Sequence, residues 1–239
     1  MLEIGPGQGA LTRHLAGKVR RLVCVEKDDS LVEGLRVQFA FEPSVEIIHA
    51  DILDVQLESV SADPAALKVI GNIPYNITTP ILFNLLERRP RPCEIVLLVQ
   101  REVAERIVAP PWGKTYGALA VGVRTVADAE RVLDVGRKAF RPVPDVESAV
   151  IRITPHTPPR LEEAEEQAVR RLSRHAFGQR RKQFQRILRD AYGLDAEAIS
   201  QIERKLGISL QNRPETFAPE QFVALAHELE EIAAHTPGR

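Results

Sequence analysis

Close to its first residue, the chain carries the sequence Leu2-Glu3-Ile4-Gly5-Pro6-Gly7-Gln8-Gly9, in which an apolar run leads into a glycine-rich turn. Residues 10–16 then have the spacing of a helix. Glycines between a strand and a helix let the backbone turn tightly and approach a ligand closely, and the helix N-terminus favours negative or polar ligand groups. The G-x-G-x-G spacing differs from the G-x-G-x-x-G of dinucleotide-binding folds, which argues against NAD. We therefore expect Gly5, Gly7 and Gly9 to border a ligand pocket of another kind.

Short apolar runs alternate with helical patterns as far as residue 153. The expected strands are rich in β-branched residues and bounded by Gly, Pro or Asp, and they cover residues 2–4, 22–25, 45–49, 68–70, 94–99 and 148–153. The expected helices between them cover residues 10–16, 31–41, 80–86 and 102–108. Because parallel strands are covered on both faces, such continuously apolar runs predict a mostly parallel sheet in a doubly wound α/β domain.

The pattern changes after residue 153. The segment Thr154-Pro155-His156-Thr157-Pro158-Pro159 is expected to be a linker, since proline cannot continue the interior of a helix or strand. Beyond it, residues 162–188, 196–206 and 219–234 have helical spacing, and no strand pattern recurs. We therefore predict two domains, an α/β domain over residues 1–154 and a small all-α domain over residues 155–239.

Composition limits the class of protein. The 239 residues are 44% hydrophobic and 27% charged, as in a globular chain rather than a disordered one. The formal net charge of −1 gives no indication of a nucleic-acid or membrane partner, and no apolar stretch approaches the ~20 residues of a membrane span. Cys24 and Cys93 both lie in apolar runs, as reduced core residues of a cytoplasmic protein do. His14, His175 and His227 have no partners at metal-ligand spacing, so we predict no metal site.

Two acidic residues follow the glycine turn at the ends of successive predicted strands. Glu26 lies about 20 residues after Gly5, where a carboxylate can accept hydrogen bonds from ribose hydroxyls. Asp51 ends the third predicted strand, where its side chain can accept a hydrogen bond from an adenine amino group. A single acid at a strand end commonly caps a helix or faces solvent, but two beside a glycine turn favour an adenosine-containing cofactor.

The segment Gly71-Asn72-Ile73-Pro74-Tyr75 follows the fourth predicted strand. In one interpretation it is a strand-terminating turn, because Asn and Pro are turn residues and Tyr can simply pack. In the other it binds an exocyclic adenine amine: the Asn72 oxygen and a backbone carbonyl freed by Pro74 accept the two amine hydrogens, and Tyr75 stacks on the flipped base. These acceptors then stabilise the charge that develops as a methyl group moves in line from a sulfonium to nitrogen. Phe140, in a proline-rich loop, either stacks on the other face of the base or fills a hydrophobic seam between domains.

Positive charge is concentrated in the C-terminal part of the chain. Eight Lys or Arg residues and no Asp or Glu occur between Arg170 and Arg189. Apolar residues at near-helical spacing in the same segment turn much of this charge outward. A solvated helix face is the ordinary explanation, but the lack of compensating acids favours contact with RNA phosphates. The residues expected to make it are Arg174, Arg180, Arg181, Lys182 and Arg186.

Together these motifs resemble those of the ribosomal RNA adenine dimethyltransferases, a family of class I S-adenosylmethionine-dependent methyltransferases. The matching segments are residues 2–12, 71–80, 100–106, 116–117, 140–150, 177–182 and 212–215, so the resemblance covers almost the whole chain. It implies a Rossmann-like class I methyltransferase sheet with a small all-α C-terminal domain.

The resemblance also implies a cofactor, a substrate and site residues. S-adenosylmethionine would be held by Glu3, Gly5, Gly7, Gly9, Glu26, Asp51 and Asn72. The target base would be handled by Asn72, Ile73 (through its carbonyl), Pro74, Tyr75 and Phe140. The implied reaction dimethylates N6 of two adjacent adenosines near the 3′ end of small-subunit rRNA. The partner would be this rRNA or the assembling small subunit in the cytoplasm, and we expect a monomer without membrane or metal partners.

The chain departs from the family pattern in two places. Pro144-Asp145-Val146-Glu147-Ser148 stands where the family has Pro-Lys-Val-Asp-Ser, which removes a basic residue near the RNA path. Family members also carry a segment before the first strand that closes over the methionine end of the cofactor, and we expect this chain to lack it through truncation or a misassigned start.

Two alternative functions follow. One is the methylation of a large-subunit adenine, as in macrolide-resistance enzymes, which share the Asn-x-Pro-Tyr chemistry. Three segments fit the small-subunit family better than the large-subunit one: Thr79-Pro80, residues 142–148 and Arg213-Pro214-Glu215. The other is a catalytically impaired RNA-binding factor in ribosome assembly, which the expected lack of the closing segment would favour.

Overall fold

The computed structural model describes residues 1–141 and 143–235, so Pro142 of the predicted loop and residues 236–239 of the predicted helical domain lie outside the described residues. The chain forms two compact units. Unit 1 comprises Met1–Ala104 and Asp128–Thr157, and unit 2 comprises residues 105–127 and the chain from Pro158 onward. Residues 105–127, which the sequence analysis assigns to the first domain, therefore pack with the C-terminal helices.

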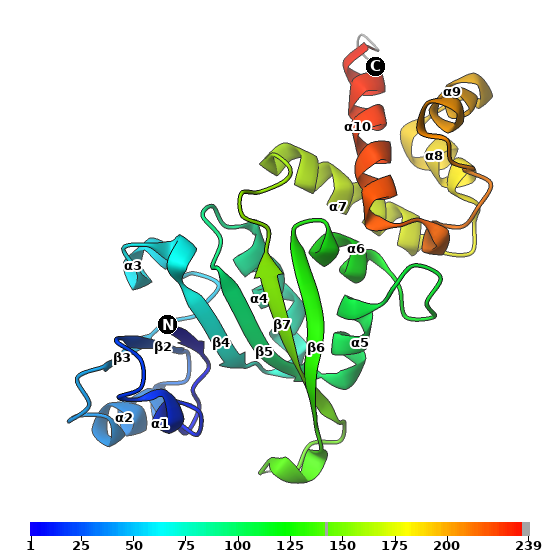
Figure 1. The fold of residues 1–239 in the computed structure, drawn as a ribbon. Helices are drawn as coiled ribbons and strands as arrows, with labels where there is room; N and C mark the ends of the chain where they lie inside the picture. The colour runs from blue at the N-terminus through cyan, green and yellow to red at the C-terminus, as the bar shows by residue number, and fades with distance from the viewer. Residues whose placement is uncertain (142, 236–239) are drawn as a thin grey trace. The chain divides into compact units, whose positions relative to one another are not determined.

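Unit 1 is built on a seven-stranded sheet with the strand order β3-β2-β1-β4-β5-β7-β6 (Figure 1). The strands are β1 Leu2–Ile4, β2 Leu22–Glu26, β3 Val45–His49, β4 Lys68–Asn72, β5 Glu94–Gln100, β6 Ala127–Val135 and β7 Ser148–Pro155. The five neighbouring strands β3, β2, β1, β4 and β5 pair in parallel. Strand β7 pairs antiparallel with β5. The strand order reverses between β1 and β4, and the carboxyl ends of strands at such a switch point are where open α/β sheets bind ligands.

Short helices connect these strands. They are α1 Thr12–Leu15, α2 Asp29–Gln38, α3 Leu57–Val60 and α4 Thr78–Glu87, with single 3-10 turns at η1 Pro64–Ala66, η2 Tyr75–Ile77 and η3 Arg137–Ala139. Helix α5 Arg101–Val108 begins in unit 1 and ends in unit 2. Helix α2 begins before the predicted residue 31 because the Asp28 side chain caps it by accepting a hydrogen bond from the Ser30 N–H.

All six predicted strands form, and the structure adds a seventh, β6, that no sequence pattern indicated. Only the first residue of β6 is buried, and its side chains include Asp128, Glu130, Arg131 and Asp134. The strand lies at the edge of the sheet, where charged side chains are common because they discourage pairing with another chain. Such a strand lacks the continuous apolar run by which buried parallel strands are recognised.

Unit 2 consists of helices around its own apolar core. They are α6 Ala118–Arg124, α7 Glu163–Gly178, α8 Phe184–Tyr192, α9 Ala196–Leu206 and α10 Pro219–His235, with a 3-10 turn at η4 Pro214–Thr216 (Figure 1). The core includes Leu172 and Phe184, which are fully buried. Within the described residues, no helix is both long and apolar enough to cross a membrane.

The prediction of helical structure throughout residues 162–188 is wrong, because a turn at residues 179–183 separates α7 from α8. The backbone N–H groups of Phe184 and Gln185 donate to the carbonyls of Asn212 and Leu210, at 2.9 and 2.7 Å. The start of α8 is thus tied to the chain that follows α9, and the Phe184 ring packs 4.9 Å from that of Phe217. This tertiary packing ends a helical pattern that the sequence alone would continue.

Candidate functional site

The glycine turn lies between β1 and α1 in a left-handed backbone conformation. The φ angles of Gly5, Gly7 and Gly9 are 62°, 58° and 73°, values that residues with a side chain rarely adopt. A Cβ atom at Gly7 would have nothing within 4 Å, whereas one at Gly9 would lie 3.0 Å from the Phe39 ring. Gly7 thus leaves open space for a ligand, and Gly9 allows close packing against the end of α2.

A cavity of about 810 Å³ opens at the carboxyl ends of β1, β2 and β4. This volume lies in the range of small-molecule and cofactor sites. The predicted residues that line it are Glu3, Gly5, Gly7, Glu26, Asp51, Asn72 and Pro74. The cavity also has an apolar lining that no sequence motif indicated, which includes Leu31, Ile52, Ile77 and Ile81. The structure therefore brings the glycine turn, both strand-end acids and the Asn72 segment to a single cavity, although Gly9, Ile73, Tyr75 and Phe140 do not line it.

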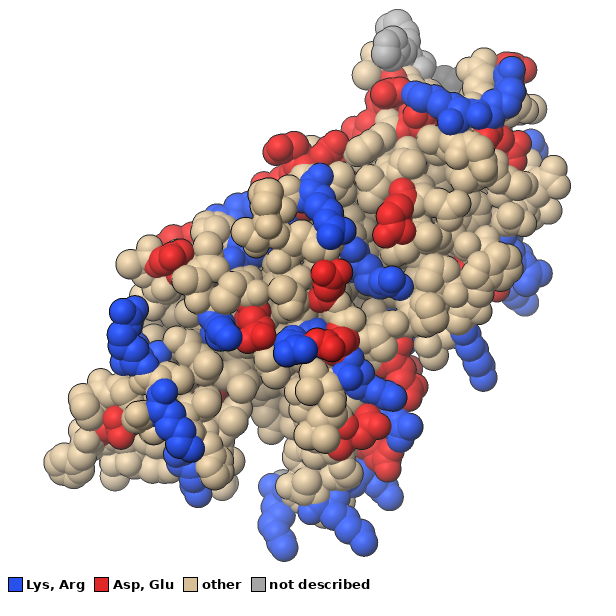
Figure 2. Space-filling view, in the orientation of Figure 1, with Lys and Arg blue, Asp and Glu red and all other residues tan. Residues whose placement is uncertain are grey.

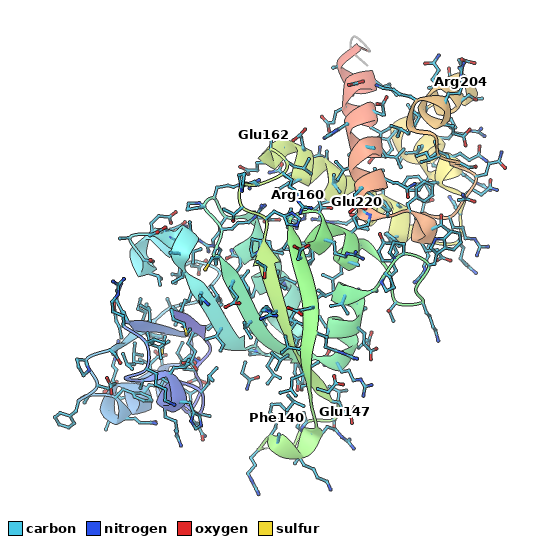
Figure 3. The ribbon with its side chains drawn as sticks, viewed as in Figure 1. Phe140, Glu147, Arg160, Glu162, Arg204 and Glu220 are labelled. Carbon is cyan, nitrogen blue, oxygen red and sulfur yellow. The ribbon has the colours of Figure 1, made fainter. Side chains whose placement is uncertain are left out.

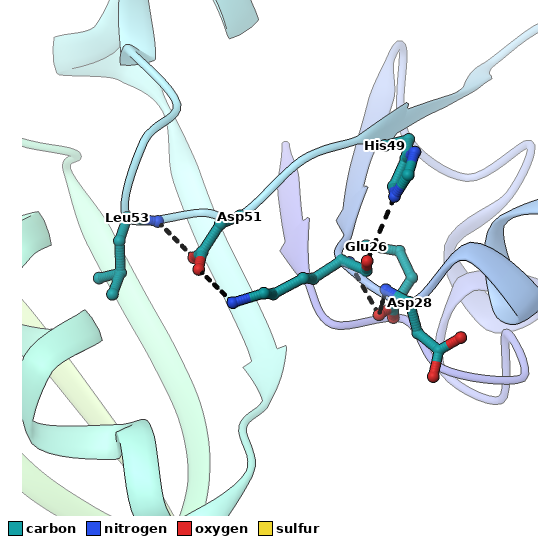
Figure 4. Close-up of polar contacts among 6 residues, drawn as sticks. Glu26, Asp28, His49, Asp51 and Leu53 are labelled. Atoms are coloured by element: carbon teal, nitrogen blue, oxygen red, sulfur yellow. Dashed lines mark hydrogen bonds and ion pairs between the residues drawn. The ribbon is translucent and has the colours of Figure 1, made fainter.

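Glu26 is the last residue of β2 and is only 8% exposed. Its Oε2 accepts a hydrogen bond from the Gly7 N–H at 3.1 Å, and its Oε1 accepts from the N–H groups of Lys27 and Asp28 at 2.9 and 3.0 Å. The carboxylate thus fixes the glycine turn to the end of β2, and Figure 4 shows its contacts with the residues that follow this strand. Because each carboxylate oxygen can accept two hydrogen bonds, Oε2 keeps one free position for a ligand hydroxyl.

Asp51 lies two residues beyond the end of β3 and is held by two donors (Figure 4). Its Oδ2 pairs with the Lys27 Nζ at 2.8 Å, and its Oδ1 accepts from the Leu53 N–H at 3.0 Å. The hydrogen bond from Lys27 is the main cause that lowers the pKa of Asp51. The Lys27 side chain is 75% exposed, so this ion pair contributes little to stability and can yield to a ligand.

Glu3, in the middle of β1, is a buried carboxylate at the wall of the cavity. It is 2% exposed, and no Lys or Arg among the described residues forms an ion pair with it. The Cys24 Sγ donates to its Oε2 at 3.5 Å, and burial raises the pKa of Glu3. Acidic residues are rarely buried without a cation, so Glu3 is an unusual residue for a wall of this kind.

Asn72 is the last residue of β4, and its exposed side-chain amide makes no hydrogen bond with a described residue. The Pro74 carbonyl already accepts the Ile77 N–H at 3.1 Å, which leaves the preceding carbonyl, that of Ile73, as the acceptor beside Asn72. The Tyr75 hydroxyl is 2.7 Å from the Oγ of Ser148, a fully buried residue at the start of β7. This bond fixes the ring of Tyr75 to the sheet.

Phe140 lies in the loop between η3 and β7, at the end of the sheet where Figure 3 labels it near Glu147. The next residue, Arg141, lines the cavity that Asn72 lines. Arg137, Lys138 and Arg141 are exposed, and Figure 2 shows Lys and Arg side chains gathered at this tip. Glu147, which stands where the family has an aspartate, pairs with Arg101 at 2.6 Å.

The basic residues predicted to contact RNA lie on α7, on α8 and in the turn between them. Arg180 pairs with Glu215 at 2.5 Å, and Lys182 pairs with Asp190 at 2.8 Å. Arg174, Arg181 and Arg186 are exposed and form no ion pair with a described residue. Three of the five predicted cations are therefore available to a polyanion without breaking an existing pair. The described residues contain no cluster of metal-binding side chains.

The polar residues that sequence reasoning missed include Lys27 and Arg141 at the cavity and Ser148 behind Tyr75. Lys27 follows Glu26 directly, but it belongs to none of the sequence motifs. Ser148 belongs to a segment that was compared with the family pattern, but its link to Tyr75 spans 73 positions of the chain and no local pattern reports it. Arg141 follows Phe140, and its position on the cavity depends on how the loop folds back.

Comparisons with known proteins agree with this geometry. The sequence model of a family described as ribosomal RNA adenine dimethylase matches residues 1–231. "Ribosomal RNA small subunit methyltransferase A" of Geobacter metallireducens is 41% identical over 96% of this chain and 84% of the relative. The protein of the same name from Pseudomonas aeruginosa is 36% identical over 97% of this chain and 84% of the relative.

Two solved structures share the fold. A dimethyladenosine transferase from Plasmodium falciparum superposes with a TM-score of 0.82, at 21% identity, over 97% of this chain and 90% of that one. The 23S rRNA methyltransferase ErmE superposes with a TM-score of 0.72, at 28% identity, over 96% of this chain and 90% of that one.

Proposed function

Because the chain belongs to the ribosomal RNA adenine dimethylase family, we propose that it dimethylates N6 of two adjacent adenosines near the 3′ end of small-subunit rRNA. The observation that carries this proposal is the cavity shared by the glycine turn and the Asn72 segment. It supports a reaction between a bound cofactor and an amine presented by Asn72. The choice of the small subunit is supported by relatives named for it, at 36% and 41% identity, against 28% for the 23S rRNA enzyme.

We place S-adenosylmethionine in this cavity, where it supplies a methyl group on a sulfonium. The residues present fit such a group. Gly7 provides backbone without a side chain, and the free position on Glu26 Oε2 suits a ribose hydroxyl. Ile52 and Ile77 offer apolar surface for an adenine ring. The Asp51 carboxylate would accept a hydrogen bond from the adenine amine, in exchange for its exposed pair with Lys27.

The target adenine would be held by the Asn72 segment. The Asn72 side-chain oxygen and the Ile73 carbonyl accept the two hydrogens of the adenine amine, which turns the nitrogen lone pair away from the ring and toward the cofactor. Because both acceptors are fixed before the reaction, they stabilise the positive charge that develops on nitrogen. Tyr75, anchored by Ser148, stacks on the base, and Phe140 covers its other face. The attacking nitrogen displaces a neutral thioether from the sulfonium and, once methylated, loses a proton to solvent. One amine hydrogen remains, so one acceptor still orients the nitrogen for the second transfer.

We assign cofactor binding and catalysis to unit 1 and RNA binding to the helices of unit 2. Arg174, Arg181 and Arg186 would neutralise phosphates, while Arg180 and Lys182 would contribute after exchanging their carboxylate partners. The substrate would be small-subunit rRNA or the assembling subunit in the cytoplasm, bound by a monomer.

The proposal is tested with methyl-labelled S-adenosylmethionine and undermethylated ribosomal subunits. We expect label in the small subunit, at two adjacent adenosines, and none in the large subunit. Label confined to the large subunit would overturn the choice of substrate. Asn72→Ala should abolish incorporation while leaving RNA affinity nearly unchanged, since Asn72 acts on the amine. Normal turnover by this variant would refute the amine-acceptor role.

A non-catalytic assembly factor is the competing function, and calorimetry separates the two. Titration with S-adenosylmethionine should release heat if the cavity holds the cofactor. A chain that binds RNA but gives no heat at millimolar cofactor would be a binding module rather than an enzyme.

A further inference from the structure

Trp112 is a large aromatic residue whose side chain is exposed to solvent. It lies in the loop between α5 and α6, within unit 2, and is 75% exposed. Its φ angle is 69°, in the left-handed region that residues with a side chain rarely occupy, and it is the one such non-glycine residue among those described. Backbone conformations of this kind persist where the surrounding structure imposes them, and they gather at ligand-binding positions.

Hydrogen bonds fix the backbone that carries this indole. The Trp112 N–H donates to the Glu215 carbonyl at 2.8 Å, and the Gly113 N–H donates to the Pro110 carbonyl at 3.1 Å. The Arg180 Nη2 donates to the Gly113 carbonyl at 3.5 Å, while its Nε pairs with the Glu215 carboxylate at 2.5 Å. The loop is therefore joined to η4 and to the basic turn after α7, which fixes the backbone that carries the exposed indole.

Positively charged residues neighbour Trp112, Arg180 and Glu215 in the three chain segments that these hydrogen bonds join. Lys114 is two residues along the same loop, Arg181 follows Arg180, and Arg213 lies two residues before Glu215. All three side chains are exposed, and none forms an ion pair with a described residue. The Glu215 carboxylate, which is close to the loop, is neutralised by Arg180.

We propose that the indole of Trp112 stacks on an unpaired base of an RNA strand whose phosphates are held by the flanking cations. This inference deepens the proposed function and rests on it for the class of substrate. Proteins recognise single-stranded RNA by stacking bases on exposed aromatic rings within a basic surface, and both elements are present here. A protein partner is less suited to this surface, because the indole is a single apolar group among unpaired cations rather than part of an apolar patch.

The test uses the intrinsic fluorescence of the full chain, because Trp112 is its only tryptophan. Titration with single-stranded oligoadenylate should quench the emission, since stacking places a base against the indole. Inorganic polyphosphate carries phosphates without bases, so it should bind the cations and leave the emission unchanged. Equal quenching by polyphosphate would overturn the proposal.

Variants then separate stacking from charge. Trp112→Gly removes the ring while favouring the same backbone conformation, and it should weaken binding of labelled oligoadenylate about tenfold without changing the dependence of affinity on salt. Trp112→Phe should retain most of the affinity. Arg181→Ala should instead reduce the slope of log K against log salt by about 0.7. Phe41→Ala, which removes a fully exposed ring from unit 1, is the matched control and should change neither.

Failure of this inference can be distinguished from failure of the proposed function. Unchanged RNA affinity in Trp112→Gly overturns the stacking role, whatever subunit the wild-type enzyme methylates. Quenching by RNA together with loss of affinity in Trp112→Gly supports the stacking role, even if methyl label is absent from the small subunit.

Discussion

Among single residues, Glu3 shows how the site departs from what stability alone would favour. Burial raises its pKa above the ~4.3 of an exposed glutamate. The folded protein therefore holds this proton at pH values where the unfolded chain has lost it. Stability then falls as the pH rises through the interval between the unfolded and the folded pKa. The ionised carboxyl is a destabilising group at the cavity wall.

Removal of this charge should therefore stabilise the fold. We expect Glu3→Gln to melt at a higher temperature than the wild type at pH 7, because the neutral amide still accepts the Cys24 hydrogen bond without the penalty of a buried charge. The difference should shrink below pH ~4, where both states of the wild type are protonated. Thermal unfolding across this pH range measures it, and a less stable variant at pH 7 would contradict it.

Ser148 and Tyr75 form a second pair whose role can be measured. The hydroxyl of Ser148 is fully buried and holds the Tyr75 hydroxyl at 2.7 Å, so its loss should loosen the ring rather than remove it. We expect Ser148→Ala and Tyr75→Phe each to lower kcat for methyl transfer by about two- to tenfold, the effect of one hydrogen bond. The double variant should be no worse than either single one. Fully additive losses would show that the two hydroxyls act separately.

Sequence motifs at strand ends did identify residues that the fold brings to one cavity, although their roles stay predictions. Gly5, Glu26, Asp51 and Asn72 all line the cavity, because the carboxyl ends of neighbouring parallel strands meet at one edge. Lys27 and Ser148 were not predictable in the same way. Their partners are set by side-chain reach and by the antiparallel return of β7, neither of which leaves a local signature.

At the scale of elements, the pairing of β1 with β4 builds the switch point where the cavity opens. Ile4 and Gly71 are paired in the register of these strands, and a Cβ atom at Gly71 would lie 2.9 Å from the Ile4 carbonyl oxygen. The two strands can therefore approach this closely only because residue 71 lacks a side chain.

Two glycine-to-alanine changes should have opposite effects on stability. Gly71→Ala should destabilise the fold by about 1–3 kcal/mol, because the backbone oxygen of Ile4 cannot move aside. Gly34→Ala, on the exposed face of α2 with nothing within 4 Å of the new Cβ, should stabilise it by about 0.5–1 kcal/mol. Urea unfolding of both variants measures the difference, and a neutral Gly71→Ala would show that the strands can separate without cost.

Element prediction was reliable for buried strands and poor for elements defined by their neighbours. The strands up to β5 were found within a few residues of their ends, because most of them are apolar over most of their length. Strand β6 has charged side chains, and the division between α7 and α8 depends on hydrogen bonds to residues 210 and 212. In both cases the deciding contact lies far away in the sequence.

For the whole molecule, the net charge and a single domain boundary concealed two features, the local positive charge and the composition of unit 2. A net charge of −1 gave no indication of a nucleic-acid partner, yet the turn after α7 and the neighbouring helices carry exposed cations without carboxylate partners among the described residues. A division at the proline-rich segment was also too simple, because unit 2 takes residues 105–127 from the middle of the sequence. Only spatial packing shows that these residues share a core with the C-terminal helices.

The bond from the Tyr116 hydroxyl to the Phe217 carbonyl joins residues 101 positions apart, and both are buried in the core of unit 2. A chain emerging from the ribosome exposes Tyr116 long before Phe217 has been made. All strands of the unit 1 sheet are available once residue 155 has left the ribosome, so this sheet can fold first. Residues 105–127 then remain an apolar segment without the C-terminal helices against which they pack. The order of synthesis thus leaves the helical unit as the last part of the nascent chain to become resistant to proteases.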